Sequence, residues 1–370
     1  PLAGVDQALQ GKVAGVNITQ NTGAPGEGVS VRIRGVGSIN SSNSPLYIVD
    51  GVPTTNALNN LSVSDIESIS VLKDAASSAI YGSRANNGVV LITTKKGVSG
   101  KPVVTCNTQF GIQRHGALTK MTNTDQYVEI YNEAAQNDNA FITNDILKRP
   151  LISPEYAATL PNVNHLEEIF QNALIQNHSV SVSGGNDKTR YLLSANQFGQ
   201  EGIILNSNYQ RTIAKVSLST DAYDWLTIGS NLNISVDENN AIGSSGDGYG
   251  GNGGSVVRYA FFRTPAIPVY LQNGDFVDLP DEPRFFGDGY NPVGLALNQN
   301  NTRKETRIFG NVNAAIKIYD NLNLVSTLGI DKGNYNRRRF DRRWGTFYRI
   351  NNPNTLSVID GDFMNWSWSN

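Results

Sequence analysis

The chain has 370 residues, a formal net charge of −2 and one cysteine, Cys106. The balanced charge gives no basic footprint for a nucleic acid, and a single cysteine excludes an intrachain disulfide framework. No apolar run is long enough for a transmembrane helix, which excludes a helical inner-membrane transporter. Glycine is abundant at 36 residues and only 17% of residues are charged, a composition that suits turns and β structure.

The first hundred residues are predicted to form a small mixed α/β unit. Alternating apolar and polar side chains at 29–34 predict a strand with one buried face. The apolar run Leu46–Val49 predicts a strand covered on both faces, and Asp50-Gly51 after it is a hairpin-turn signal. Further strands are expected at 68–72 and 89–94, and helices at 6–13 and at 75–81, the latter with Asp74 as its N-cap and Gly82 at its end.

Beyond residue 100 the sequence predicts long amphipathic strands. Residues 214–219 alternate apolar and polar side chains, and the same period of two recurs at 226–237, 308–319 and 322–331. A lipid-facing barrel with a wet lumen needs this pattern, and a soluble β-sandwich with an apolar core produces it too. Strands are expected near 102–113, 177–184, 189–199, 209–220, 225–237, 306–319 and 322–335, with an eighth beginning near Asp362.

The connections between these strands alternate in length. Tight turns are expected at 184–188, 221–224 and 320–321, with long loops at 114–176, 238–305 and 336–361 and a moderate one at 200–208. Outer-membrane barrels combine short periplasmic turns with longer external loops, whereas a sandwich has no reason to obey that parity. Tyr223, Trp225 and Tyr319 flank two tight turns, where an interfacial aromatic girdle is expected. In the first long loop, residues 123–136 predict an amphipathic helix capped by Asn123 or Thr124.

Several ordered motifs in the first hundred residues carry a family resemblance. The segments LQGKVAGVNITQNTGAPGEGVSVRIRGVGSI, PLYIVDGVP and DIESISVLKDAASSAIYGSRANNGVVLITTKKG resemble the plug domain of the SusC/RagA family of TonB-dependent outer-membrane transporters, from about Leu9 to Gly97. The resemblance implies active import of a large nutrient, usually a glycan and sometimes a peptide, by gating of a plugged barrel. It also implies a location in the bacterial outer membrane, among its lipids.

The same resemblance implies partners and no bond chemistry. The expected partners are a SusD-like surface lipoprotein, the TonB–ExbB–ExbD energy-coupling complex and the transported glycan or peptide. No cofactor and no enzymatic activity are expected. An alternative is a passive porin or an outer-membrane adhesin, although an open porin has no use for the N-terminal α/β unit. A secreted β-rich protein acting on polysaccharide is a further alternative, which would need two converging carboxylates.

The expected fold is mainly β, with a mixed α/β plug inside an antiparallel transmembrane barrel of about 22 strands. Residues 1–99 are assigned to the plug, with its N-terminus incomplete, and residues 100–370 to the N-terminal part of the barrel. A barrel of about eight strands is filled by its own side chains. The chain, with roughly seven or eight barrel strands, is therefore expected to be part of a longer protein.

The candidate site residues belong to gating and substrate contact. Arg32 and Arg34 lie on the polar face of a plug strand, so they are candidates for ion pairs with the barrel wall; ordinary surface charge is the alternative. Candidates for contact with substrate are Ser38, Asn40, Ser42 and Asn43 in the polar loop after that strand, and Arg258 and Tyr259 in the long loop. For the last two, packing in the barrel mouth is the favoured alternative.

Catalytic and metal-binding patterns are absent. Gly35-Val-Gly37 fails the dinucleotide-binding pattern, and the three histidines, His115, His165 and His178, lack metal-ligand spacing and are expected to face solvent. Asp275, Asp278 and Asp281 are weak calcium candidates, and a solvated acidic loop is favoured because the ordered calcium-loop pattern is missing. Cys106 alternates in phase with Val104 and Phe110, which predicts a lipid-facing position.

Overall fold

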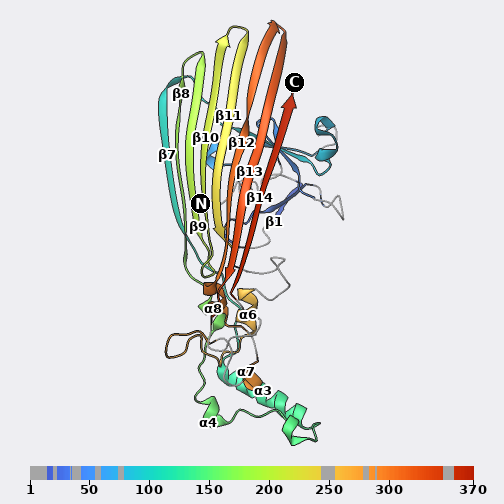
Figure 1. Cartoon of the computed structure of the whole chain (residues 1–370), viewed down its shortest axis with the longest axis vertical. Coiled ribbons are helices and arrows are strands. Elements are labelled where there is room, and N and C mark those ends of the chain that lie inside the picture. The colour runs from blue at the N-terminus through green and yellow to red at the C-terminus, as the bar shows by residue number, and fades with distance from the viewer. Residues whose placement is uncertain are drawn as a thin grey trace.

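The computed structural model of the chain describes residues 15–19, 23–33, 35, 43–54, 60–73, 79–242, 255–277, 283–287, 290–344 and 354–370. One large antiparallel sheet dominates it, with a smaller unit against one face of that sheet and a group of short helices beyond one end (Figure 1). Among the described residues no helix has both the length and the apolar character needed to span a membrane.

The large sheet, which we call the wall, is an antiparallel meander. Each strand pairs with its neighbours in chain order, from β7 at one edge to β14 at the other. The strands are β7 (Gly100–Gln113), β8 (Ala173–Gly185), β9 (Thr189–Glu201), β10 (Asn208–Tyr223), β11 (Leu226–Asn240), β12 (Gln299–Tyr319), β13 (Leu322–Asp341) and β14 (Thr355–Ser369). Such a meander is the connectivity of an up-and-down barrel.

Three strand ends differ from those expected by six or seven residues, more than any other. β12 begins at Gln299 instead of 306, β13 continues to Asp341 instead of 335, and β14 begins at Thr355 instead of near Asp362. These extensions pair with one another through the backbone, as in Lys304 opposite Asn336 and Asn336 opposite Asp360. The extension at 299–305 is polar on both faces, so it carries no apolar alternation by which the sequence could reveal it, whereas the extensions of β13 and β14 include Phe340, Leu356 and Val358.

The two faces of the wall have opposite character. On β10 the apolar Val216 and Leu218 are 45% and 42% exposed, whereas Lys215 and Ser217 between them are 1% and 4% exposed. The polar positions are covered because they face the smaller unit, and the apolar positions point outward. A soluble sandwich would bury the apolar set instead. The alternation is therefore that of a membrane barrel, and Cys106 lies on the outward face as expected, exposed and opposite Val180.

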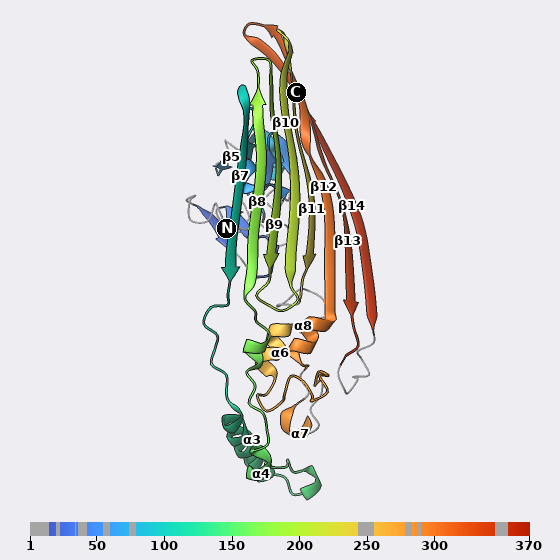
Figure 2. The ribbon, with the colours of Figure 1, turned by 90° about the vertical axis from the view of Figure 1, so that its left-hand side faces the viewer.

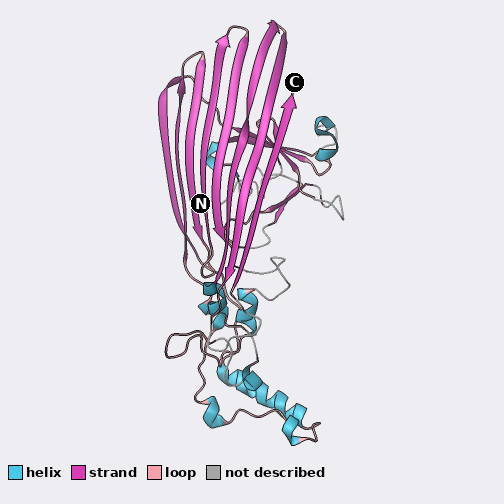
Figure 3. Ribbon diagram, in the orientation of Figure 1, coloured by secondary structure: helices cyan, strands magenta, loops and turns pink. Residues whose placement is uncertain are grey.

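Tight turns and helices lie at opposite ends of the wall (Figures 2 and 3). The turns between β8 and β9, β10 and β11, and β12 and β13 are at the end remote from the helices, which confirms the alternation expected from loop lengths. Tyr223 and Trp225 stack at a centroid distance of 5.6 Å beside one of these turns. Tyr319 beside another is 69% exposed, so aromatic side chains mark this rim on the outward side.

The smaller unit, which we call the plug unit, comprises the described residues between Gly15 and Gly97. It contains a four-stranded mixed sheet in the order β4-β3-β6-β5 and a two-stranded ribbon, β1-β2. The strands are β1 (Val16–Thr19), β2 (Ser30–Ile33), β3 (Leu46–Val49), β4 (Val52–Thr54), β5 (Ile66–Leu72) and β6 (Val89–Thr94), with 3₁₀ turns η2 (Val63–Asp65) and η3 (Ala79–Ala85).

The structure can be compared with the turn and helices that the sequence predicts for the plug unit. Asp50 and Gly51, with φ of 47° and 88°, form the expected hairpin turn between β3 and β4. Of the helix expected at 75–81, residues 75–78 lie outside the described residues, while residues 79–85 form 3₁₀ turns that Gly82, with φ 61°, kinks. Asp74 and the expected helix at 6–13 lie outside the described residues.

The long loops contribute all the α-helices of the described chain. They are α3 (Thr124–Asn139), α4 (Pro154–Ala157), α5 (His165–Glu168), α6 (Val256–Phe262), α7 (Pro283–Phe286) and α8 (Pro292–Asn298), with the 3₁₀ turn η4 (Asp145–Leu147). α3 begins with a capping box in which the side chains of Asn123 and Gln126 each bond the backbone N–H of the other. Two apolar clusters, around Tyr131 and around Leu166, hold the loops together.

Candidate functional site

The candidate site is the contact between the plug unit and the inward face of the wall. Strand alternation directs every second side chain of β10–β13 inward, and the sequence places polar groups at those positions. The inward positions that bond or approach the plug unit include Lys215, Asn231, Ser235, Arg307, Asn311 and Asp331.

A buried ion pair of the wall holds one end of plug strand β4. The Arg307 guanidinium donates through Nε and Nη2 to the two carboxylate oxygens of Asp331, both at 2.6 Å. Thr54 of β4 donates from Oγ1 to Asp331 Oδ2 at 2.9 Å and accepts from Arg307 Nη2 at 2.8 Å. Both charged side chains are 3% exposed, so Thr54 completes a network that is shielded from solvent.

A second polar contact joins β10 to the end of plug strand β6. Lys215 is 1% exposed and donates from Nζ to the backbone oxygen of Lys95 at 2.8 Å. Asp65 of the plug unit lies near this lysine. Burial raises the pKa of the Asp65 carboxyl, while Ser194, Lys215 and Lys95 oppose that shift. The Lys215 ammonium thus interacts with two groups of the plug unit, the backbone oxygen of Lys95 and the buried carboxyl of Asp65.

The remaining contacts are amide and hydroxyl bonds beside a cavity. Asn311 donates to the backbone oxygen of Asp50 at 2.8 Å, and Ser235 donates to Asn60 Oδ1 at 3.1 Å. A cavity of about 340 Å³ separates plug unit and wall here, lined by Asp50, Gly51, Thr93, Lys96, Asn231, Asn311, Asn313 and Thr327. The interface is therefore polar and incompletely filled at this level.

Two apolar contacts interrupt this polar surface. Phe309 of β12 is 6% exposed and belongs to the apolar core cluster of the plug unit, which also includes Ile33 and Val49. Val52 of β4 lies against Gly329 of β13, where a Cβ atom would come within 2.8 Å of both Val52 methyl carbons. A larger residue than glycine at 329 would therefore push the plug unit away from the wall.

The expected plug residues lie elsewhere or outside the described chain. Arg32 is exposed on β2 and forms no ion pair with any other described residue, while Asn43 is partly buried. Arg34, Ser38, Asn40 and Ser42 lie outside the described residues. The wall contacts instead use Arg307, Asp331 and Lys215. The sequence could have indicated these three residues, because each is a charged side chain at a position that the apolar–polar alternation of its strand directs inward.

The expected loop residues serve packing in the structure. Arg258 lies over the Phe262 ring at 5.1 Å, and Tyr259 meets Tyr290 edge to face at 5.1 Å. Asp275 is exposed and accepts from Asn273 at 2.8 Å, while Asp278 and Asp281 lie outside the described residues. Within the described ranges, no three His, Cys, Asp or Glu side chains gather as metal ligands would.

The expectation that all three histidines face solvent is wrong for His165. This residue is 2% exposed, whereas His115 is exposed. His165 is covered because the segment around it pairs with a distant loop, through a bond from Val163 N to Pro265 O at 2.9 Å. Such a contact across about a hundred residues leaves no local pattern in the sequence.

Comparison with known proteins agrees with this architecture. Residues 1–89 match the family model of the TonB-dependent receptor plug domain. The TonB-dependent receptor P26 of Formosa agariphila is 37% identical over 310 residues, which are 82% of this chain and 29% of that protein. The TonB-dependent receptor SusC of Bacteroides thetaiotaomicron is 32% identical over 291 residues, 76% of this chain and 26% of that protein.

Comparison with solved structures also indicates a TonB-dependent transporter. The chain superposes on the RagAB peptide importer in its closed-closed state with a TM-score of 0.81 and 26% identity, over 100% of this chain and 43% of that one. The chain thus spans about a third or less of the curated relatives it matches. The plug motifs, the inward polar face of the wall and these likenesses agree, and the chain belongs to the SusC/RagA family of TonB-dependent receptors of the bacterial outer membrane.

Proposed function

We propose that the protein imports a large nutrient across the outer membrane by TonB-driven displacement of the plug unit. The observation that carries this proposal is the network in which Thr54 of the plug unit completes the buried Arg307–Asp331 pair of the wall. A plug held by such bonds is seated firmly until a force shifts it. On this proposal the protein transports its substrate and makes or breaks no covalent bond.

The polar character of the contact suits release. Hydrogen bonds are short-ranged and directional, so a small movement of β4 breaks them, and water can then satisfy the freed groups. The cavity of about 340 Å³ beside Asn311 gives that water a place to enter. An interface built only of apolar side chains would instead expose apolar surface to water throughout the movement.

The substrate is a glycan on this proposal, with an oligopeptide as the second choice. The likeness to a curated SusC and the family's usual cargo support the glycan, while the RagAB structures are titled as those of a peptide importer and support the peptide. The partners would be a SusD-like lipoprotein over the helical end of the wall and the TonB–ExbB–ExbD complex at the end with tight turns.

A passive porin or adhesin is the competing function. It predicts that solute passes, or the cell adheres, without movement of the plug unit and without TonB. The two functions are separated by locking the plug unit to the wall. Val52 and Gly329 offer the site, because a Cβ atom at 329 would lie within 2.8 Å of both γ carbons of Val52, so the Sγ atom of a cysteine at 52 would lie within reach of a cysteine at 329.

The experiment uses the full-length protein in its native host, with Cys106→Ser as the background. Val52→Cys and Gly329→Cys are introduced together, and uptake of fluorescent oligosaccharide and casein-peptide pools is measured with and without TonB. We expect oxidation to abolish uptake in the double variant and a reductant to restore it, with the Val52→Cys single variant active throughout. Uptake through the cross-linked protein, or uptake independent of TonB, would contradict the proposal.

A further inference from the structure

The inward face of the wall carries a group of arginines between the plug contact and the helical end. β13 contains the run Arg337-Arg338-Arg339, and β12 contains Arg303. Strand alternation places Arg303, Arg337 and Arg339 on the same face as Arg307, whereas Arg338 points outward. We call these three inward residues the arginine group. Arg303 and Arg307 are separated along β12 by about 13 Å, at roughly 3.3 Å per residue, so the group lies between the plug contact and the loops.

Two members of the arginine group lie directly opposite each other. Arg303 of β12 pairs with Arg337 of β13 in the antiparallel register. Side chains at such positions have Cβ atoms about 4.5–5.5 Å apart, and like charges placed there repel. An anion between the two guanidinium groups would remove this repulsion. The wall therefore has an electrostatic preference for negative charge at this level.

Neighbouring side chains hold these two guanidinium groups in position. Arg303 donates through Nη2 to Glu305 Oε2 at 2.6 Å and lies over the Tyr335 ring at 5.0 Å. Arg337 donates through Nε to Asn301 Oδ1 at 2.9 Å. A guanidinium has five N–H donors in a planar fork, so this support fixes its orientation and is compatible with further bonds to an oxyanion.

The arginines are more exposed than the acids beside them. The Arg303 side chain is 47% exposed, whereas that of its partner Glu305 is 13% exposed. Arg339 donates through Nε to Asp341 Oδ2 at 3.0 Å, and these two side chains are 27% and 22% exposed. A solute that enters from the helical end therefore meets guanidinium groups before it meets carboxylates.

The other charges of this part of the wall lie mainly toward β11. Asp237 of β11 is opposite Arg211 of β10 on one side and opposite Glu305 of β12 on the other. Among the described residues of β10–β14 on this part of the inward face, the charged side chains are Arg211, Arg303, Arg337, Arg339, Asp237, Glu305 and Asp341. The arginine group thus leaves an excess of positive charge on β12 and β13.

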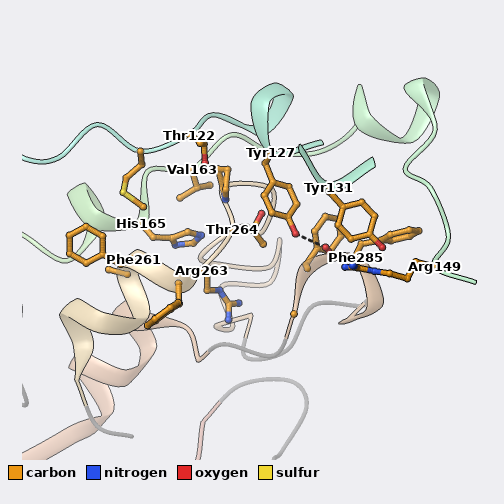
Figure 4. Close-up of a pocket in the computed structure, with 16 residues that line it drawn as sticks. Thr122, Tyr127, Tyr131, Arg149, Val163, His165, Phe261, Arg263, Thr264 and Phe285 are labelled. Carbon is orange, nitrogen blue, oxygen red and sulfur yellow. Dashed lines mark hydrogen bonds between the residues drawn. The ribbon is translucent and has the colours of Figure 1, made fainter. Parts of the chain in front are cut away.

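Two further arginines at this end of the molecule belong to the loops. Arg149 and Arg263 line a cavity of about 410 Å³ among the loop helices (Figure 4). Arg149 donates to the Asp138 carboxylate at 2.8 Å, and Arg263 donates through Nη2 to the backbone oxygen of Val277 at 2.5 Å. Both therefore stabilise the loops themselves, and the arginine group is confined to the wall.

These observations identify a class of ligand. The planar fork of a guanidinium matches two oxygens of a sulfate or a carboxylate, and charge-assisted hydrogen bonds are stronger than neutral ones. We propose that the arginine group binds an oxyanion, as a sulfate ester or a carboxylate, on the molecule that the protein imports. The inference rests on the proposed import function and adds to it a preference for negatively charged cargo, which the group would attract from the loops toward the plug unit.

The test measures binding of small polyanions by the purified full-length protein. In calorimetric titrations, myo-inositol hexasulfate probes the sulfate ester, cyclohexanehexacarboxylate probes the carboxylate, and uncharged myo-inositol is the neutral control. Arg337→Gln and Arg303→Gln each remove a charge and keep an amide. Arg338→Gln removes the same charge from the next residue of β13, which is exposed and points outward, so it is the matched control.

We expect the wild type to bind at least one of the polyanions and not myo-inositol. Arg337→Gln should weaken that binding at least tenfold, and the double variant with Arg303→Gln should weaken it further. Arg338→Gln should match wild type. Arg337→Lys keeps the charge but loses the planar fork, so it should retain part of the affinity and shows the effect in a chain of unchanged net charge. The polyanion that binds more tightly identifies the oxyanion.

Absence of polyanion binding by the wild type would overturn the inference, as would equal losses in Arg337→Gln and Arg338→Gln or equal binding of myo-inositol. Resistance of the plug unit to protease in each variant checks that the fold is retained. The import function is judged separately. If plug locking abolishes uptake while Arg337→Gln binds both polyanions as wild type does, import stands and the oxyanion site is refuted.

Discussion

Thr54 of the plug unit and Asp331 of the wall share a hydrogen bond of 2.9 Å although 277 positions separate them in the chain. Asp331 also accepts both bonds of Arg307, so the plug unit is attached to the wall at a fully formed ion pair. Because Arg307 and Asp331 both belong to the wall, their pair can persist when Thr54 leaves. The attachment can therefore break without leaving a lone buried charge.

Breaking the pair itself should be costly. Asp331→Ala leaves the Arg307 charge buried without its partner, and we expect the free energy of unfolding to fall by about 3–5 kcal/mol. The double variant Arg307→Leu and Asp331→Leu should lose much less, because no isolated charge remains. Urea unfolding of the full-length protein in detergent, followed by protease sensitivity of the plug unit, measures both. Lys317→Ala, in an exposed pair with Asp320, should change little, and equal losses in all variants would contradict the argument.

The loops around His165 should be sensitive to acid. His165 has a pKa of about 4 in the folded loops against an ordinary value near 6.5, so the folded state binds fewer protons between these two values. Stability of the loops should therefore be complete above pH 6.5 and fall as the pH drops toward 4, by up to about 3 kcal/mol. Hydrogen exchange of peptides covering 160–170, corrected for intrinsic rate, measures the fall.

The groups that face His165 define the control for this experiment. Arg263 disfavours the imidazolium, and the backbone groups of Ile267 and Thr264 favour it more weakly. His165→Leu should abolish the pH dependence at 160–170 and leave exchange in the wall strands unchanged. The same acid response in that variant would show that another group titrates.

A charge on the outward face should be tolerated only beyond the apolar band. Leu328 points outward from β13 and is 55% exposed, so Leu328→Lys places an ammonium against lipid and should cost about 2–4 kcal/mol if the position lies near the midplane. Asn334 lies on the same face of β13 beyond the apolar residues, and Asn334→Lys should have little effect. Folding yield into lipid vesicles compares the two, and equal yields would contradict the assignment of faces.

Cys106 provides a chemical test of the same assignment. It is exposed and outward on β7, beside Val180 of β8. In intact outer membranes we expect a lipid-soluble maleimide to label it and a membrane-impermeant maleimide to fail. Ser99→Cys, in the exposed segment before β7, should react with the impermeant reagent once the periplasm is opened. Labelling of Cys106 by the impermeant reagent in intact cells would place it in water.

The wall could be predicted from the sequence because its residues repeat with a period of two that any reader can count. Val216 and Lys215 each show their face by their chemistry alone. The polar extension from Gln299 to Glu305 could not be found in that way, since its pairing depends on backbone bonds to β13 and not on an apolar face.

The sequence predicted a polar contact between the plug unit and the wall, but it did not predict which residues form that contact. Alternation directs Arg307 and Asp331 inward, yet only the folded wall shows that Thr54 meets them. The contacts among the long loops could not be predicted from the sequence at all. Tyr127 and Phe285 are 158 positions apart, and no local propensity records that they touch.

Phe309 has a consequence for the order of assembly. Phe309 belongs to strand β12 of the wall, yet its side chain is part of the apolar core cluster that includes Ile18, Val31, Ile33 and Val49 of the plug unit. A plug unit released alone from the chain would lack this ring and carry a gap among those side chains. Its native packing is therefore complete only once β12 is in place, so the outer-membrane strands act as a template on which the N-terminal segment matures, although that segment leaves the ribosome first.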